Sequence, residues 1–266
     1  MANTTTMAVA HDDPAVWPMP VDPDRRADSR TERKFCVPGP LAAAALDLAR
    51  GYLVPDALAL GPQQRITSLY LDTPQLTFLR WHRERAADRF KLRIRRYGDG
   101  PAPTLYAEVK RKTGSIVQKQ RAAFPSGALR FVLGNADMTV WDGWPYRTGD
   151  LEAFVRHRSQ RAATPRMLVT CVRESLRNPT TAIAVTVDRD LRYQPIRNGD
   201  LVGDDSSWQP IPLPTLSEHG AALIELKYGP APPLWMEELV VQLSPWRVSF
   251  SKYAAAMNAH LPAGIG

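Results

Sequence analysis

Long basic side chains alternate with apolar ones in several short segments of the chain, and this alternation restricts the fold more than any other feature of the sequence. In the segment FKLRIRRY, Lys91, Arg93 and Arg95 take every second position, and apolar residues stand between them. Residues two apart share one face of a β-strand, so the segment predicts a strand with a basic face and an apolar face. A single strand of this kind is also typical of an antiparallel sheet with one face in water.

Eight segments have the pattern of strands and six that of helices. The predicted strands are 30–37, 65–72, 90–97, 104–112, 115–124, 166–175, 182–191 and 222–229. The predicted helices are 40–53, 74–85, 126–134, 150–161, 233–243 and 251–261. They do not alternate regularly, which favours an α+β fold with an antiparallel sheet or barrel over a parallel doubly wound sheet. We expect one domain over residues 29–262, after a disordered N-terminal segment of residues 1–28 that is rich in Pro, Asp and Thr.

Most charged residues of five predicted strands share one face of their strand. They are Arg30, Glu32 and Lys34; Lys91, Arg93 and Arg95; Glu108, Lys110 and Lys112; Lys119 and Arg121; and Glu225 and Lys227. On an open sheet these cations would repel one another, whereas a sheet closed with this face inside would form a cationic tunnel that attracts a polyanion. The glutamates inside it would offer the oxygen ligands that hard cations such as Mg²⁺ and Mn²⁺ prefer.

The overall charge agrees with an anionic partner, since the formal net charge is +7. Nucleic acid is not favoured, because the basic residues are not interleaved with stacking aromatic residues and no helix carries a concentrated basic stripe. The sequence also lacks a GxxxxGK[ST] phosphate loop. Two cysteines in separate predicted strands, with no signal peptide and no apolar run of membrane length, predict a cytoplasmic protein without a transmembrane segment.

A set of motifs carries a family resemblance. In order they are RTERKF, SLYLDTP, KLRIRRYG, AEVKRKTG, VQKQR, TCVRESL, VTVDRDLRY, LIELKYG and FSKY. Their order and spacing resemble the VTC (vacuolar transporter chaperone) polyphosphate polymerase domain, within the wider CYTH-like group of triphosphate tunnel metalloenzymes. The resemblance covers roughly residues 29–257. It implies an antiparallel β-tunnel of about eight strands with a charged interior, helices packed outside, and Mn²⁺ or Mg²⁺ as cofactor.

The strand faces and the resemblance together imply three sets of site residues. The residues expected to act in catalysis are Arg93, Arg95, Lys112 and Arg173. The residues expected to bind phosphate are Lys34, Lys91, Lys110, Lys119, Arg121, Arg189, Lys227 and Lys252. The metal ligands are expected to be Glu225 first, then Glu32 and Glu108. Many members of the family have an arginine where this chain has Ala184, so Arg189 is a candidate replacement for that cation.

The resemblance implies an enzyme that binds ATP and moves its γ-phosphoryl group onto a polyphosphate chain. Two alternatives stay open at this point: a triphosphatase of the same fold, and a polyphosphate-binding module without catalysis. A polyphosphate acceptor is already an anionic nucleophile, whereas water would need a carboxylate as base. The SPX module and membrane helices of the eukaryotic relatives are not in this sequence, so we expect different regulation. A membrane protein partner and the oligomeric state also stay open.

Overall fold

The computed structural model describes residues 31–57, 61–100, 103–114, 116–134, 143–196, 207–214 and 220–261. The predicted disordered segment of residues 1–28 and the predicted domain limits at residues 29 and 262 lie outside this part of the chain. The described helices include none that is long and apolar enough to cross a membrane.

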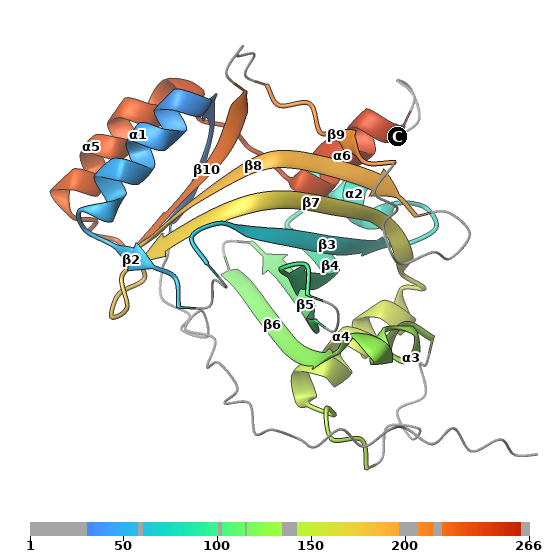
Figure 1. Ribbon diagram of the computed structural model, residues 1–266. Coiled ribbons are helices and arrows are strands. Elements are labelled where there is room, and N and C mark those ends of the chain that lie inside the picture. Colours follow the sequence, from blue (N-terminus) through green and yellow to red (C-terminus); the bar gives the residue numbers. More distant parts are fainter. Residues whose placement is uncertain are drawn as a thin grey trace, which may run out of the picture.

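One antiparallel sheet of ten strands forms the body of the protein (Figure 1), in the order β1-β10-β8-β7-β3-β4-β5-β6, with β2 paired to β7 and β9 paired to β8. The strands are β1 (Thr31–Pro38), β2 (Val54–Pro55), β3 (Gln64–Asp72), β4 (Asp88–Tyr97), β5 (Thr104–Thr113), β6 (Ile116–Pro125), β7 (Thr164–Arg177), β8 (Ala184–Pro195), β9 (Gln209–Pro210) and β10 (Ala221–Tyr228). The α+β class and the antiparallel sheet are thus confirmed. The eight predicted strands are all present, and β2 and β9 are additional because two-residue strands carry no alternation to detect.

The six predicted helices are also present. They are α1 (Gly39–Arg50), α2 (Thr77–Arg83), α3 (Leu129–Gly134) with the preceding 3₁₀ turn η2 (Ser126–Ala128), α4 (Gly149–Gln160), α5 (Leu234–Leu243) and α6 (Lys252–His260). A second 3₁₀ turn, η4 (Ser244–Trp246), follows α5. In α1 the buried residues Ala42, Ala45, Leu46 and Ala49 recur at the spacing that places them on one side of a helix.

Two groups of helices cover the apolar face of the sheet at its two ends. Helices α1 and α5 lie side by side next to β10 (Figure 1), and their apolar residues share one core with Phe35, Val187 and Ile224 of the strands. Helix α4 and the short α3 lie near β6, and their apolar residues share a second core with residues of β3 to β6, such as Leu92. Burial of this face therefore leaves the opposite, charged face of the strands to form the inside of the curled sheet.

Helix α6 differs from the expectation that the helices pack outside, because it lies against the charged face. Its residues Tyr253 and Met257 share a third core with Ile66, Met167 and Val169 of β3 and β7. In β7 the charged face thus continues into apolar residues, and these residues are the ones that α6 covers. The helix closes off part of the inside of the sheet and carries its own first residue, Lys252, to the charged face.

The sheet curls until its two halves face each other. The Oε2 atom of Glu32 on β1 lies 3.8 Å from the Nζ atom of Lys110 on β5, although five strands separate β1 from β5 in the hydrogen-bonding order. Among the described residues no backbone ladder joins β1 to β6. The charged face is therefore concave, and side chains rather than backbone hydrogen bonds connect its two sides.

Candidate functional site

Three arginines surround Glu108 on the concave face. Arg93 lies directly opposite Glu108 across the β4–β5 ladder, with its Nε atom 2.5 Å from Oε2. Arg121 Nε lies 3.5 Å and Arg95 Nη1 4.0 Å from Oε1 of the same carboxylate. Burial alone would raise the pKa of Glu108, but the three guanidinium groups outweigh it and lower the pKa to about 2. Glu108 is thus an ionised centre that holds three cations together.

A second cluster contains lysines and two glutamates. Lys34 Nζ lies 3.0 Å from Oε1 of Glu225 and 3.4 Å from Oε1 of Glu32. Lys110 is 3.8 Å from Glu32, and Lys227 Nζ is 4.0 Å from Oε2 of Glu225. Burial and the neighbouring Glu225 would raise the pKa of Glu32, but the lysines lower it to about 2. The pKa of Glu225 is likewise well below its usual value, because lysines, first Lys34, outweigh its burial.

Asp188 of β8 organises a third cluster that the sequence analysis did not single out. Its carboxylate accepts hydrogen bonds from Nε and Nη2 of Arg173 at 2.6 and 2.8 Å, and it also accepts one from Nζ of Lys252. Asp188 is completely buried. Burial opposes its ionisation, but Arg173 and Lys252 lower its pKa below the ordinary range. The alternation of Thr186 and Asp188 on the concave face of β8 was the available signal, but a lone aspartate in a strand did not stand out.

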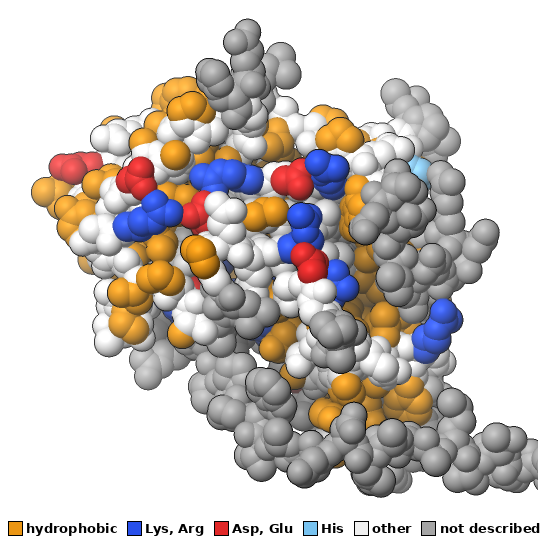
Figure 2. Space-filling model, viewed as in Figure 1, with side chains coloured by type: hydrophobic (Ala, Val, Ile, Leu, Met, Phe, Trp, Pro, Cys, Tyr) orange, Lys and Arg blue, Asp and Glu red, His pale blue; other side chains and the backbone are white. Residues whose placement is uncertain are grey.

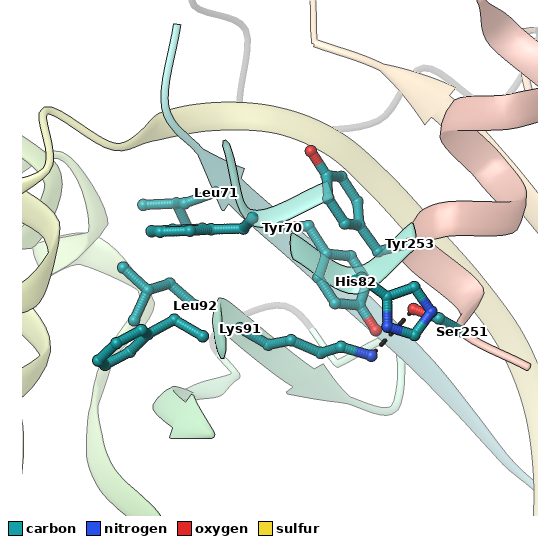
Figure 3. Close-up of a pocket in the computed structure, with 9 residues that line it drawn as sticks. Tyr70, Leu71, His82, Lys91, Leu92, Ser251 and Tyr253 are labelled. Atoms are coloured by element: carbon teal, nitrogen blue, oxygen red, sulfur yellow. Dashed lines mark hydrogen bonds between the residues drawn. The ribbon is translucent and has the colours of Figure 1, made fainter. Parts of the chain in front are cut away.

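Lys91 has a neutral hydrogen-bond partner and, unlike Lys34 and Arg93, no carboxylate within ion-pair distance among the described residues. Its Nζ atom donates to Oγ of Ser251 at 3.0 Å, next to His82 and Tyr253 (Figure 3). Burial, together with the charges of Lys34 and nearby cations, lowers the pKa of Lys91 to about 7. Among the described residues Lys91 therefore has no ion pair within 4 Å, and Glu32 only partly offsets the effect of burial and of the other cations. It lies at the point where α2 and α6 meet the tunnel wall.

Asp72 positions the two helices that form this end of the site. Its carboxylate accepts hydrogen bonds from the backbone N–H groups of Thr73, Phe78 and Leu79, at 2.7, 2.8 and 3.0 Å, and so caps the start of α2. It also accepts a hydrogen bond from the hydroxyl of Tyr253 on α6 at 2.8 Å. One buried carboxylate thus fixes both α2 and the helix that carries Lys252.

Lys112, predicted to act in catalysis, and Lys119, predicted to bind phosphate, extend the row of cations, whereas Arg189 does not join it. Lys112 and Lys119 lie on the concave face of β5 and β6 by alternation, at the end nearest the hairpin between these strands. Arg189 instead points to the opposite face, where it pairs with the Glu174 carboxylate that also binds Arg50. Arg189 therefore does not replace the cation missing at Ala184. Figure 2 shows acidic and basic side chains lying next to one another on the outer surface near β7 and β8.

The three predicted metal ligands are not equivalent. Glu225 and Glu32 both approach Lys34 and lie near each other, and Thr186 stands opposite Glu225 in the ladder with a buried hydroxyl that has no hydrogen-bond partner among the described residues. Two carboxylates with a hydroxyl nearby fit a Mg²⁺ or Mn²⁺ ion that takes its other ligands from water and phosphate. Glu108 does not fit the role of a metal ligand, because its carboxylate is already paired with Arg93, Arg95 and Arg121. The described residues contain no cluster of three or more side chains typical of a metal site.

A curled antiparallel sheet whose concave face holds rows of lysines and arginines defines a class of protein built around a cationic tunnel. The chain belongs to the VTC domain family, whose model matches residues 29–261. No curated protein matches the chain.

Solved structures similar to the chain share little sequence with it. One is a putative adenylate cyclase from Bacillus halodurans, at 12% identity and a TM-score of 0.49, with 84% of this chain and 94% of the other covered. Another is a putative adenylyl cyclase from Hippeastrum, described as having a dominant triphosphatase activity, at 13% identity and a TM-score of 0.46, with 87% and 97% covered.

Proposed function

We propose that the protein is a metal-dependent phosphotransferase that moves the γ-phosphoryl group of ATP onto a polyphosphate chain inside the tunnel. The observation that carries the proposal is the row of cations on the concave face, from Arg95 and Arg93 to Lys91 on β4 and from Arg121 to Lys119 on β6. Phosphoryl transfer needs positioning and charge stabilisation more than covalent help, and fixed cations in a buried tunnel supply both. Membership of the VTC domain family supports the same reaction class.

The carboxylates support transfer to phosphate over hydrolysis. Hydrolysis would need a base to deprotonate or orient water, and such a base works best with a pKa near the working pH. Glu32 and Glu108 have pKa values of about 2, and cations lower the pKa of Asp188 and Glu225 as well. None of these four groups is a good general base, whereas a terminal phosphate acceptor needs none.

Glu225 and Glu32 would hold the divalent ion when it is bound, and the ion would offset charge on the phosphate oxygens. Lys34 lies between the two carboxylates and would remain close enough to contact the same phosphate. Arg93, Arg95 and Arg121 would bind the transferred group and its neighbours, since guanidinium groups match the geometry of phosphate oxygens. Arg173 and Lys252, held by Asp188, would complete the opposite wall.

The test is a product analysis of the purified protein with ATP and Mn²⁺ or Mg²⁺. We expect ADP together with a ladder of polyphosphate on a gel, and faster chain growth when short polyphosphate is added as acceptor. Orthophosphate as the sole phosphorus product besides ADP would replace this proposal with the triphosphatase. Binding of tripolyphosphate without any turnover would leave the protein a polyphosphate-binding module.

We also propose the cytoplasm as the location, because Cys36 and Cys171 are buried and are not joined in a disulfide, which suits a reducing compartment. A membrane protein partner stays a prediction.

A further inference from the structure

The concave face changes in character at one end of the cation rows. On β4 the residues Lys91, Arg93 and Arg95 are followed two positions later by Tyr97, the last residue of the strand. On β5 the corresponding row ends in Tyr106, which lies directly opposite Arg95 in the ladder. The tunnel wall therefore passes from cations to two tyrosines within one step of the strand.

The two tyrosines form a compact group with the nearest arginines. Their rings meet edge to face, with centroids 5.4 Å apart and planes at 82°. The guanidinium carbon of Arg121 lies 4.0 Å from the ring centroid of Tyr106 and 5.3 Å from that of Tyr97. Arg95 Nη1 donates a hydrogen bond to the Tyr97 hydroxyl at 3.3 Å. Both rings are half-buried, so this group lies at the rim of the charged interior and not in a closed core.

A buried polar group at the same end has no partner. Gln64 is 7% exposed, and its Nε2 atom has no hydrogen-bond partner among the described residues. It is two positions before Ile66, which pairs with Tyr97, so it lies on the same face one step beyond that tyrosine. A buried donor left unsatisfied costs free energy unless a ligand completes it.

The order of these groups matches the order of groups in a nucleoside triphosphate. Residues two apart on a strand are about 6.6 Å apart, so a triphosphate bound along Arg93 and Arg95 would bring its nucleoside to the next step, where the tyrosines stand. Aromatic rings and stacked guanidinium groups are the surfaces on which nucleobases stack. We propose that Tyr106 and Tyr97 form a nucleobase subsite of the tunnel, in which the base of the nucleoside triphosphate stacks on Tyr106.

The subsite rests on the proposed function and gives the tunnel a direction. With the base at the tyrosine end, the γ-phosphate points toward Lys91, Lys110 and Lys34. The polyphosphate acceptor then approaches from the lysine end, where Lys110 is 39% exposed and Lys119 is exposed, so that the chain grows away from the nucleotide. The two substrates thus meet head to head, as an in-line transfer requires.

The experiment compares ATP with inorganic tripolyphosphate, which has the phosphates but no base. Calorimetric binding at one free Mg²⁺ concentration would be measured for the parent protein, for Tyr106→Leu and for Tyr106→Phe. We expect Tyr106→Leu to weaken ATP binding about 5- to 150-fold, the range for loss of one stacked base, and to leave tripolyphosphate binding within about twofold. Tyr106→Phe keeps the ring and should restore ATP binding.

Retention of tripolyphosphate binding also shows that the variant is folded. Equal losses for both ligands, or no loss for ATP, would overturn the base subsite and reduce Tyr106 to a support for Arg121. If the parent protein binds tripolyphosphate and binds ATP no more tightly, the base subsite is wrong, but the proposal of a phosphate-binding tunnel is retained. If it binds neither ligand, the proposed function fails and the subsite with it.

Discussion

Arg93 and Glu108 face each other across the β4–β5 ladder, with the guanidinium Nε 2.5 Å from a carboxylate oxygen. Their strand faces predict a shared wall, although from the sequence alone Arg93 is expected to act in catalysis and Glu108 to bind a metal ion. The contact indicates a different relationship, in which the carboxylate keeps the arginine cluster ordered before any phosphate arrives. Ordered cations lose less conformational entropy when the substrate binds, which favours a pre-formed site.

The first prediction concerns Glu108→Gln and protein stability. Without this carboxylate, Arg93, Arg95 and Arg121 repel one another in a buried site, and we expect a loss of about 3 kcal/mol in the free energy of unfolding at pH 7. Because the pKa of Glu108 is lowered to about 2 in the folded state, its contribution is present above its unfolded pKa of about 4.3 and is lost as the pH falls toward 2.

Urea unfolding of both proteins between pH 7 and pH 2.5 measures this effect. The difference between parent and variant should be largest at neutral pH and should shrink below about pH 4. A constant difference over the whole range would show that the carboxylate charge is not the source. Saturating tripolyphosphate should also narrow the gap at pH 7, because bound phosphate offsets the same three cations.

The second prediction concerns the two inner arginines of β4. Arg93→Ala and Arg95→Ala should each lower the rate of phosphoryl transfer by on the order of 10²-fold or more, because each removes a fixed donor to the charge that develops in the transition state. Arg96 is a matched control on the same strand, since it points to the opposite face and pairs with Asp99 at 3.2 Å. Arg96→Ala should leave turnover within about twofold.

Steady-state rates with ATP and short polyphosphate check this pair of outcomes. Full turnover in both inner variants would mean that the basic face serves solubility or stability alone. A similar loss of turnover in Arg96→Ala would mean that the substitutions slow the reaction by disturbing the strand, and not by removing a cation from the concave face.

The third prediction concerns the divalent ion. Glu225→Gln should raise the concentration of Mn²⁺ needed for half-maximal rate by at least about tenfold, because an amide is a far weaker ligand than a carboxylate. Glu174 offers a matched control, since it is a similarly buried carboxylate paired with arginines on the opposite face. Glu174→Gln should lower the melting temperature without changing the Mn²⁺ requirement. Equal Mn²⁺ titrations for the two variants would remove Glu225 from the metal site.

The strand faces could be predicted from sequence because alternation is a local property. Arg93, Lys110 and Glu225 all lie where their parity places them, since each belongs to a strand whose other face is buried under helices. The prediction for Arg189 was wrong because it rested on proximity in sequence to Ala184; by parity Arg189 lies on the face opposite to Asp188, and that is where it pairs with Glu174. The pairing with Glu174 joins the neighbouring strands β7 and β8, and Arg50 of α1 binds the same carboxylate.

The pairing of charges inside the tunnel could not be predicted. The ion pair of Glu32 with Lys110 depends on the curl of the sheet, which brings β1 to β5 across five other strands. Asp188 forms an ion pair with Lys252 of α6, and this contact could not be predicted because α6 was expected outside the sheet. Such contacts arise from the tertiary arrangement, and no spacing within one segment encodes them.

The fourth prediction concerns the protonation of Lys91. Burial and the cations around it lower the pKa of this ammonium group to about 7 in the free protein, so much of it is neutral at pH 8. A bound triphosphate brings negative charge, which favours the charged ammonium and raises the pKa again. Binding at pH 8 should therefore take up protons, and affinity should fall as the pH rises above about 7, because the complex then holds more protons than the free protein.

Titration calorimetry of tripolyphosphate at pH 8, in buffers with different enthalpies of ionisation, gives the number of protons taken up. Lys91→Met should reduce this number by several tenths of a proton and should flatten the fall in affinity between pH 7 and pH 9. Uptake by the ligand itself is the same for both proteins and cancels in the comparison. Some uptake should remain in the variant, because burial also lowers the pKa of Lys227 to about 8. Unchanged uptake in Lys91→Met would mean that Lys91 is already charged in the free tunnel and that Ser251, its hydrogen-bond partner, accepts from a full ammonium group at all pH values tested.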